Sequence, residues 1–128
     1  MIATLTWNPS LDYVVTVHGF RQGRINRTEE EQIFPGGKGI NVSLVLKQLG
    51  VESIPLGFAA GFTGEEIVRL TRKQGLSPEF ITVPGGYSRI NVKWKNQDGT
   101  ELNGMGPVIG EMQKLQLYEK LNRLKAGD

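Results

Sequence analysis

The sequence predicts an α/β fold in which a parallel sheet flanked by helices is joined to a smaller antiparallel sheet. Strand and helix patterns alternate over residues 39–83, which is typical of a parallel sheet. Segments 13–17, 25–34 and 88–103 instead alternate polar and apolar residues, as strands do when one face meets water. With 128 residues, 38% hydrophobic and 22% charged, the chain has the size and composition of one globular domain.

The elements of the first third follow from periodicity and turn chemistry. A strand over residues 2–7 ends at the turn residues 8–10, and a second strand covers 13–17. The segment 25–34 is polar but compatible with a strand, and Pro35 ends it. After the glycine-rich stretch 36–39, apolar residues at helical spacing predict a helix over about 39–49. Gly50 then stands at the C′ position, where glycine often closes a helix.

The middle of the chain continues the alternation of strand and helix. A short apolar strand is expected over 53–58. Thr63 and Glu66 have the spacing of a capping box, with Thr63 as N-cap and Glu66 at the N3 position. The helix that they begin should end at Gly75, and the next strand is expected over 80–83.

A hairpin and a final helix complete the predicted elements. Residues 88–95 alternate in polarity, Asp98-Gly99 is a hairpin turn signal, and the chain returns over 100–103. The last helix is expected over 111–125, with Gly127 near its C′ position. No strand pattern follows this helix, so the sequence resembles the first part of a longer α/β enzyme whose sheet keeps an unpaired edge.

Composition excludes several function classes. The chain has no cysteine and one histidine, which rules out a disulfide scaffold, a thiol nucleophile and a multi-histidine metal site. Its net charge of +2 comes from interleaved basic and acidic residues, without the basic stripe typical of nucleic-acid binding. Neither a membrane span nor a signal peptide is predicted, so we expect a cytoplasmic protein.

The Gly-Gly-Lys-Gly stretch at residues 36–39 opens a predicted helix. Backbone N–H groups at a helix N-terminus attract anions, and Lys38 would add a full positive charge. A P-loop is excluded because Gly39 follows the lysine, and a dinucleotide fingerprint is excluded because position 42 is valine. Two interpretations stay open on the residues alone: anion or sugar binding, and a glycine turn that packs the helix tightly.

A few polar residues outside this stretch are further candidates. Asp12 follows a strand and a turn, where a carboxylate can hold sugar hydroxyls or can stabilise the turn. Asn41 lies on the first turn of the predicted helix and can cap it or face a ligand. Arg89, Arg24 and Arg27 lie on or near alternating strands. Their guanidinium groups suit phosphate, although a solvated surface role is the commoner alternative.

Five short motifs occur in order along the whole chain. They are Asn-Pro-Ser-Leu-Asp at 8–12, Pro-Gly-Gly-Lys-Gly-Ile-Asn-Val-Ser at 35–43, Leu-Gly-Val at 49–51, Gly-Phe-Thr-Gly at 61–64 and Arg-Ile-Asn-Val at 89–92. Together they closely resemble the ribokinase-like (PfkB-type) carbohydrate kinases, in particular the branch of 1-phosphofructokinases and tagatose-6-phosphate kinases. The resemblance implies that residues 1–128 form the N-terminal part of one kinase domain, with lid strands at about 13–34 and 87–103.

The resemblance also implies an activity. Kinases of this family transfer the γ-phosphoryl group of ATP, with Mg²⁺, to a hydroxyl of a sugar. Here the expected acceptor is fructose 1-phosphate, with tagatose 6-phosphate as the alternative. The lid of such kinases often forms a dimer interface, so a homodimer through the β lid is expected.

The resemblance assigns roles to eight residues. Asp12 would hold sugar hydroxyls and Arg89 the substrate phosphate. The remaining six would line the sugar or assist at the phosphate: Gly36, Gly37, Lys38, Asn41, Arg24 and Arg27.

The catalytic base of the family lies in a Gly-Ala-Gly-Asp motif in the C-terminal third, where it opens a helix. Lys125-Ala126-Gly127-Asp128 looks similar, but it has lysine in place of the first glycine and follows a helix. We therefore expect no catalytic residue in this chain and no kinase activity from it alone. The alternative is a stand-alone sugar-phosphate-binding or oligomerisation module.

Overall fold

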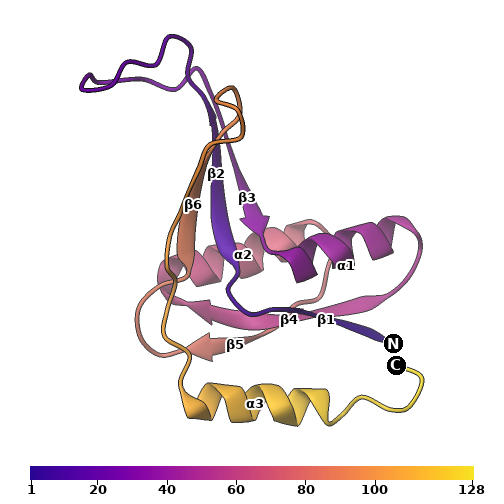
Figure 1. Cartoon of the computed structure of the whole chain (residues 1–128). Helices are drawn as coiled ribbons and strands as arrows, with labels where there is room; N and C mark the ends of the chain where they lie inside the picture. Colours follow the sequence, from indigo (N-terminus) through magenta and orange to yellow (C-terminus); the bar gives the residue numbers. More distant parts are fainter.

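The computed structural model describes residues 1–128 and confirms the α/β architecture (Figure 1). A three-stranded parallel sheet has the order β1-β4-β5, so β1 and β5 are edge strands that each pair only with β4. The strands of this sheet are β1 (Ile2–Thr6), β4 (Ser53–Ala60) and β5 (Glu79–Val83). The chain has three helices, α1 (Lys38–Gln48), α2 (Gly61–Lys73) and α3 (Glu111–Leu121).

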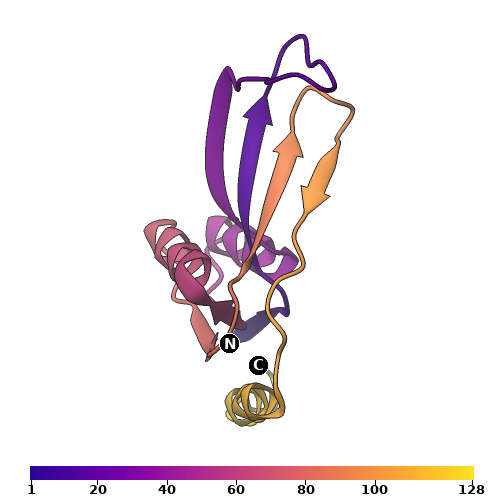
Figure 2. The same cartoon turned by 90° about the vertical axis from the view of Figure 1, so that its left-hand side faces the viewer.

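Helices cover both faces of this sheet. Helices α1 and α2 lie on one face and α3 on the other, as both cartoon views show (Figures 1 and 2). Between the sheet and α3 lies the hydrophobic core, which consists of Leu56, Phe58, Ala60, Ile81, Val83 and Leu117. Burial of this apolar surface is the main force that holds the layer together. No helix of the chain has the length and hydropathy of a membrane span.

A second sheet rises from the first and has the strand order β3-β2-β6-β7 (Figure 2). Its strands are β2 (Ser10–Thr16), β3 (Glu30–Gly36), β6 (Arg89–Trp94) and β7 (Glu101–Asn103). The expectation of an antiparallel sheet is wrong for its central pair, because β2 and β6 run parallel. The reason is topological: β2 follows β1 and β6 follows β5, and both leave the carboxyl edge of a parallel sheet in the same direction.

Two glycines end helices as predicted. In α1, the N–H of Gly50 donates to the carbonyl of Lys47 and the N–H of Val51 to that of Leu46, which is the Schellman pattern. Gly75 closes α2 in the same way. Both glycines have positive φ, of 75° and 79°, a conformation that other residues adopt at a cost.

The predicted capping box is wrong. Helix α2 begins at Gly61, two residues before Thr63, and its N-cap Ala60 makes no side-chain capping bond. The Thr63 hydroxyl instead donates to the carbonyl of Ser88 at 2.6 Å, and Glu66 pairs with Arg69. The Thr63 hydroxyl therefore binds a residue distant in the sequence, Ser88 just before β6, and does not cap the helix as the local pattern predicted.

Smaller differences concern element ends. The third strand begins at Glu30 and not near residue 25, because Asn26 ties the preceding loop to the carbonyls of Arg21 and Arg24. The last helix ends at Leu121, not at 125. Gly127 lies in a separate turn with φ of 98° and is not the C′ residue of that helix. The Asp98-Gly99 turn is confirmed, with φ of 47° and 73°.

Candidate functional site

Polar side chains gather on one face of the second sheet. Asp12 of β2 pairs in register with Asn91 of β6 and Phe34 of β3, and Ser10 pairs with Arg89 and Gly36. Directly paired residues point to the same face of a sheet, and so do residues two apart along a strand. The register therefore places Asp12 and Arg89, which are far apart in the sequence, on one face.

Asp12 is the centre of this face. Its side chain is buried, with 7% of the residue exposed. Ser10 Oγ donates to Asp12 Oδ1 at 2.6 Å, and Asn91 Nδ2 donates to the same oxygen at 3.2 Å. The Asn91 Oδ1 atom in turn accepts the backbone N–H of Gly104 at 3.2 Å, which orients the amide. A buried carboxylate held by several donors is a fixed acceptor of hydrogen bonds.

Lys93 supplies the countercharge. Its Nζ lies 2.8 Å from Asp12 Oδ2 and 4.0 Å from Glu101 Oε1. The hydrogen bond with Asp12 raises the pKa of Lys93 above its ordinary value, so the ammonium stays charged at neutral pH. The sequence motifs assigned no role to Lys93. Its place two residues after Asn91 in an alternating strand was a signal that it shares the face of Asn91 and Arg89.

The glycines at 36, 37 and 39 leave room for close neighbours. A Cβ on Gly36 would lie 2.4 Å from Ser10 Oγ and 2.5 Å from Asp12 Oδ2, so the glycine lets these two side chains pack directly against β3. A Cβ on Gly37 or Gly39 would collide with Thr6 or the backbone of Leu5. Gly37 and Gly39 thus let the first turn of α1 press against β1, where the N–H of Ile40 donates to Thr6 Oγ1 at 3.2 Å.

Arg89 stands at the base of β6, half-buried. Its Nε donates to the main-chain carbonyl of Asn8 at 3.0 Å, which is the one hydrogen bond of the Arg89 side chain. Both terminal amino groups are therefore available to a ligand. Lys38 and Asn41 lie on the first turn of α1, shortly after Gly36, and both residues are exposed. The turn thus begins where the polar face of the second sheet ends (Figure 1).

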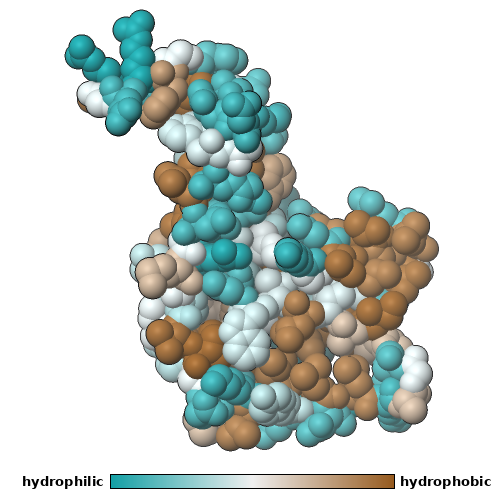
Figure 3. Space-filling model, in the orientation of Figure 1, coloured by the Kyte–Doolittle hydropathy of each residue, from teal (hydrophilic) through white to brown (hydrophobic).

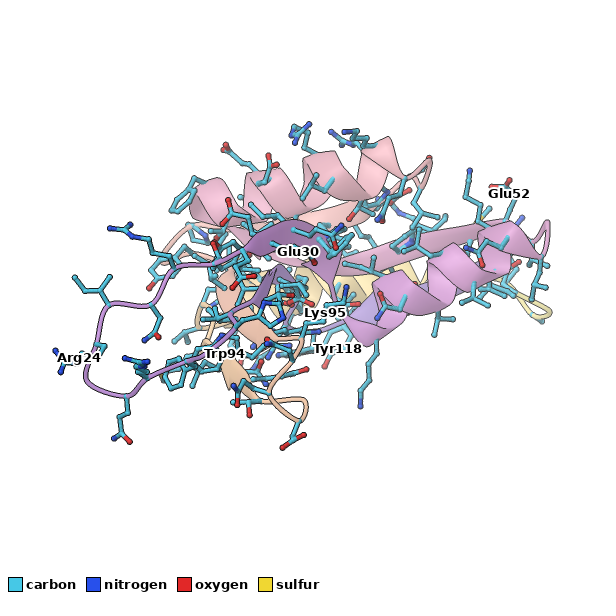
Figure 4. The ribbon with its side chains drawn as sticks, turned by 90° about the horizontal axis from the view of Figure 1, so that it is seen from above. Arg24, Glu30, Glu52, Trp94, Lys95 and Tyr118 are labelled. Carbon is cyan, nitrogen blue, oxygen red and sulfur yellow. The ribbon has the colours of Figure 1, made fainter.

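Arg24 and Arg27 are not brought to this group. Both lie in the loop between β2 and β3, at the outer end of the second sheet and away from α1 (Figure 1). Figure 4 shows the Arg24 side chain at the tip of that loop, far from the helices. The alternation of polar and apolar residues predicted that Arg24 and Arg27 lie near the second sheet. It did not predict at which end of the strands they lie.

Neither a metal centre nor a deep cavity marks the site. No group of three or more His, Cys, Asp or Glu side chains is close enough to hold a metal ion. A cavity of about 540 Å³, lined by residues of α2, β5 and α3, contains none of the eight predicted residues. The candidate site is therefore an open polar surface on the second sheet and the start of α1.

Comparison with known proteins identifies the family. A family model described as pfkB family carbohydrate kinase matches residues 6–128. The chain belongs to this family. The resemblance inferred from the five motifs is confirmed.

Relatives of this pfkB chain have named activities. It is 47% identical over its whole length to a 1-phosphofructokinase of Bacillus subtilis, of which it covers 42%. It is 42% identical to a 1-phosphofructokinase of Borreliella burgdorferi, over 97% of the chain and 40% of the relative. A D-tagatose-1-phosphate kinase of Bacillus licheniformis is 35% identical, over 99% of the chain and 41% of the relative. The chain thus spans about two fifths of these relatives.

Solved structures agree with the fold. A crystal structure from Staphylococcus aureus described as a phosphofructokinase aligns with a TM-score of 0.88 and 44% identity, over 98% of this chain and 40% of that one. The phosphofructokinase-2 of Escherichia coli, in complex with fructose-6-phosphate, aligns with a TM-score of 0.86 and 26% identity, over 98% of this chain and 42% of that one. Ribokinase-like architecture, including the second sheet, is therefore shared with these kinases.

Proposed function

We propose that this chain provides the acceptor-binding part of an ATP-dependent kinase that phosphorylates fructose 1-phosphate to fructose 1,6-bisphosphate. Two relatives, 47% and 42% identical to the chain, are 1-phosphofructokinases, which supports this acceptor. A tagatose phosphate is the second candidate, because a D-tagatose-1-phosphate kinase is 35% identical. The observation that carries the proposal is that Asp12 and Arg89 lie on one face of the second sheet. On this face, a carboxylate can accept hydrogen bonds from sugar hydroxyls and a guanidinium can donate hydrogen bonds to a phosphate.

Different side chains bind different parts of the substrate. Asp12, held by Ser10 and Asn91, accepts hydrogen bonds from sugar hydroxyls and so fixes the orientation of the sugar. The terminal amino groups of Arg89 donate to the phosphate, which suits the planar guanidinium. Lys38 and Asn41 on the first turn of α1 complete the sugar site, and Gly36 leaves room for the Asp12 carboxylate.

When bound, ATP supplies the phosphoryl group and Mg²⁺ neutralises the charge that develops during transfer. We assign no residue of this chain to ATP, and no cluster of metal ligands occurs in it that could hold Mg²⁺. Arg24 and Arg27 remain predicted phosphate contacts that the geometry of a single chain does not support. Charged substrates of this kind do not cross membranes unaided, so we infer a cytoplasmic activity.

The other face of the second sheet supports a homodimer. Ile33, Tyr13, Val92 and Leu102 form one register row across the four strands, and Ile33 and Leu102 are 54% and 62% exposed. An exposed apolar row on a sheet is a common interaction surface. We therefore expect self-association through this face, which sedimentation equilibrium measures directly.

Calorimetric titration with fructose 1-phosphate tests the proposal. We expect Arg89→Ala to weaken binding at least about tenfold, because it removes a charge-assisted contact with the phosphate. Arg72→Ala, an exposed arginine of α2 outside the site, is the matched control and should leave binding unchanged. Titration with tagatose 6-phosphate and tagatose 1-phosphate ranks the acceptors. A wild-type chain that binds none of these sugar phosphates would refute the proposal.

Two measurements separate a kinase part from a stand-alone binding module. The chain alone should release no ADP in the presence of ATP and fructose 1-phosphate. The intact mass of the protein purified from its own cells then distinguishes the two alternatives. A mass more than twice 14.2 kDa supports the kinase, and a mass near 14.2 kDa supports the binding module.

A further inference from the structure

Lys93 has a defined place at the candidate site that the proposed function does not use. It lies on the same face of β6 as Arg89 and Asn91, two residues beyond Asn91. Its ammonium is the cation that contacts the buried Asp12 carboxylate, at 2.8 Å. Arg89, the other cation on this strand face, donates instead to the carbonyl of Asn8.

The contacts of Asp12 use most of its capacity to accept hydrogen bonds. An ionised carboxylate has about four acceptor sites. Oδ1 accepts from Ser10 and Asn91, and Oδ2 is paired with Lys93. The site that is left belongs to Oδ2, the oxygen that a Cβ on Gly36 would approach to 2.5 Å. One acceptor site of Asp12, on Oδ2, therefore has no donor from the protein.

A buried carboxylate such as that of Asp12 needs a positively charged partner. Transfer of a charge away from water is costly unless a counterion and hydrogen bonds compensate for the lost hydration. Ser10 and Asn91 are neutral donors, so the compensating charge comes from Lys93. Without it, the carboxylate would be expected to turn toward water or rearrange its hydrogen bonds. Either change would move the remaining acceptor site on Oδ2.

We propose that Lys93 is a positioning residue of the acceptor site, which acts through Asp12 and not by direct contact with the sugar phosphate. This inference rests on the proposed function, in which Asp12 accepts a sugar hydroxyl. Lys93 fixes the Asp12 carboxylate so that its remaining acceptor site meets one hydroxyl of the sugar. Glu101, 4.0 Å from the ammonium on β7, holds Lys93 from the other side.

Calorimetric titration of the 128-residue chain with fructose 1-phosphate tests this role. Lys93→Met should weaken binding about tenfold, whereas the matched control Lys95→Met, an exposed lysine just after β6, should change it less than about twofold. Lys93→Arg, which keeps the charge, should restore most of the affinity. If circular dichroism shows that Lys93→Met does not fold, Lys93→Gln, which keeps a donor but not the charge, takes its place and should also bind more weakly.

A double-mutant cycle distinguishes positioning from direct contact. In the Asp12→Ala background, whose weaker binding is followed by the ligand-induced shift in melting temperature, Lys93→Met should cause no further loss. An additional loss would show that Lys93 contacts the substrate itself and would overturn the inference. Unchanged binding by the single variant would overturn it as well, while leaving the proposed function intact. A wild-type chain that binds no fructose 1-phosphate would overturn the proposed function and this inference with it.

Discussion

Gly36 shows how a single hydrogen atom in place of a side chain can define a site. The methyl group that alanine would add at this position lies 2.5 Å from Asp12 Oδ2, so Gly36→Ala must displace the carboxylate. We expect at least about a tenfold loss of fructose 1-phosphate binding and a loss of stability of about 1–3 kcal/mol, the usual cost of overpacking. Calorimetry and urea unfolding measure the two effects.

The matched control for this substitution is Gly85→Ala. Gly85 has no heavy atom within 4 Å of its ideal Cβ position and no positive φ, so alanine should be tolerated there. Equal effects of the two substitutions would contradict the packing argument at Gly36.

Individual residues of the site differ in how far the sequence alone could identify them. Asp12 and Arg89 stand in recognisable motifs, and the structure places them on one face. Lys93 could not be assigned to Asp12, because that contact depends on the parallel register of β2 and β6. No local pattern specifies which of several strands become neighbours, since pairing is a tertiary property.

At the scale of elements, Thr63 tests what holds the start of α2. The structure gives its hydroxyl a buried bond to the carbonyl of Ser88, so Thr63→Val should lower the free energy of unfolding by about 1–3 kcal/mol. Glu66→Gln should have little effect, because Glu66 makes only an exposed contact with Arg69. Urea unfolding of both variants decides between this arrangement and a capping box, in which loss of the Glu66 carboxylate would also be costly.

Helices and strands were easier to predict than the connections between them. The helices were located by apolar periodicity and by terminal glycines, and Gly50 and Gly75 end them as expected. Helix α2 begins two residues before the predicted N-cap, and the Thr63 hydroxyl is bound to Ser88. The mixed order of the second sheet follows from the direction in which β2 and β6 leave the first sheet, and alternation within a strand carries no information on direction.

At the scale of the whole molecule, the distribution of apolar surface matters for behaviour in solution. Figure 3 shows apolar atoms gathered over α1 and around the nearby end of β1. Val45 of α1, Leu49 just after this helix and Leu5 of β1 are 54%, 71% and 43% exposed. Strand β1 is also an edge strand, with one side of its backbone unpaired. An apolar surface beside an open strand edge promotes association between molecules.

A charge on this surface should therefore reduce association without unfolding the chain. Because the Val45 side chain is half exposed and packs little, we expect Val45→Lys to raise the concentration at which the chain aggregates while the melting temperature changes by less than about 2 °C. Light scattering and thermal unfolding give the two values. Ile40→Lys, at a fully buried position of the same helix, is the contrasting variant and should unfold the chain. If Val45→Lys lowers the melting temperature as Ile40→Lys does, the outer surface of α1 belongs to the core, and association must arise from the strand edge alone.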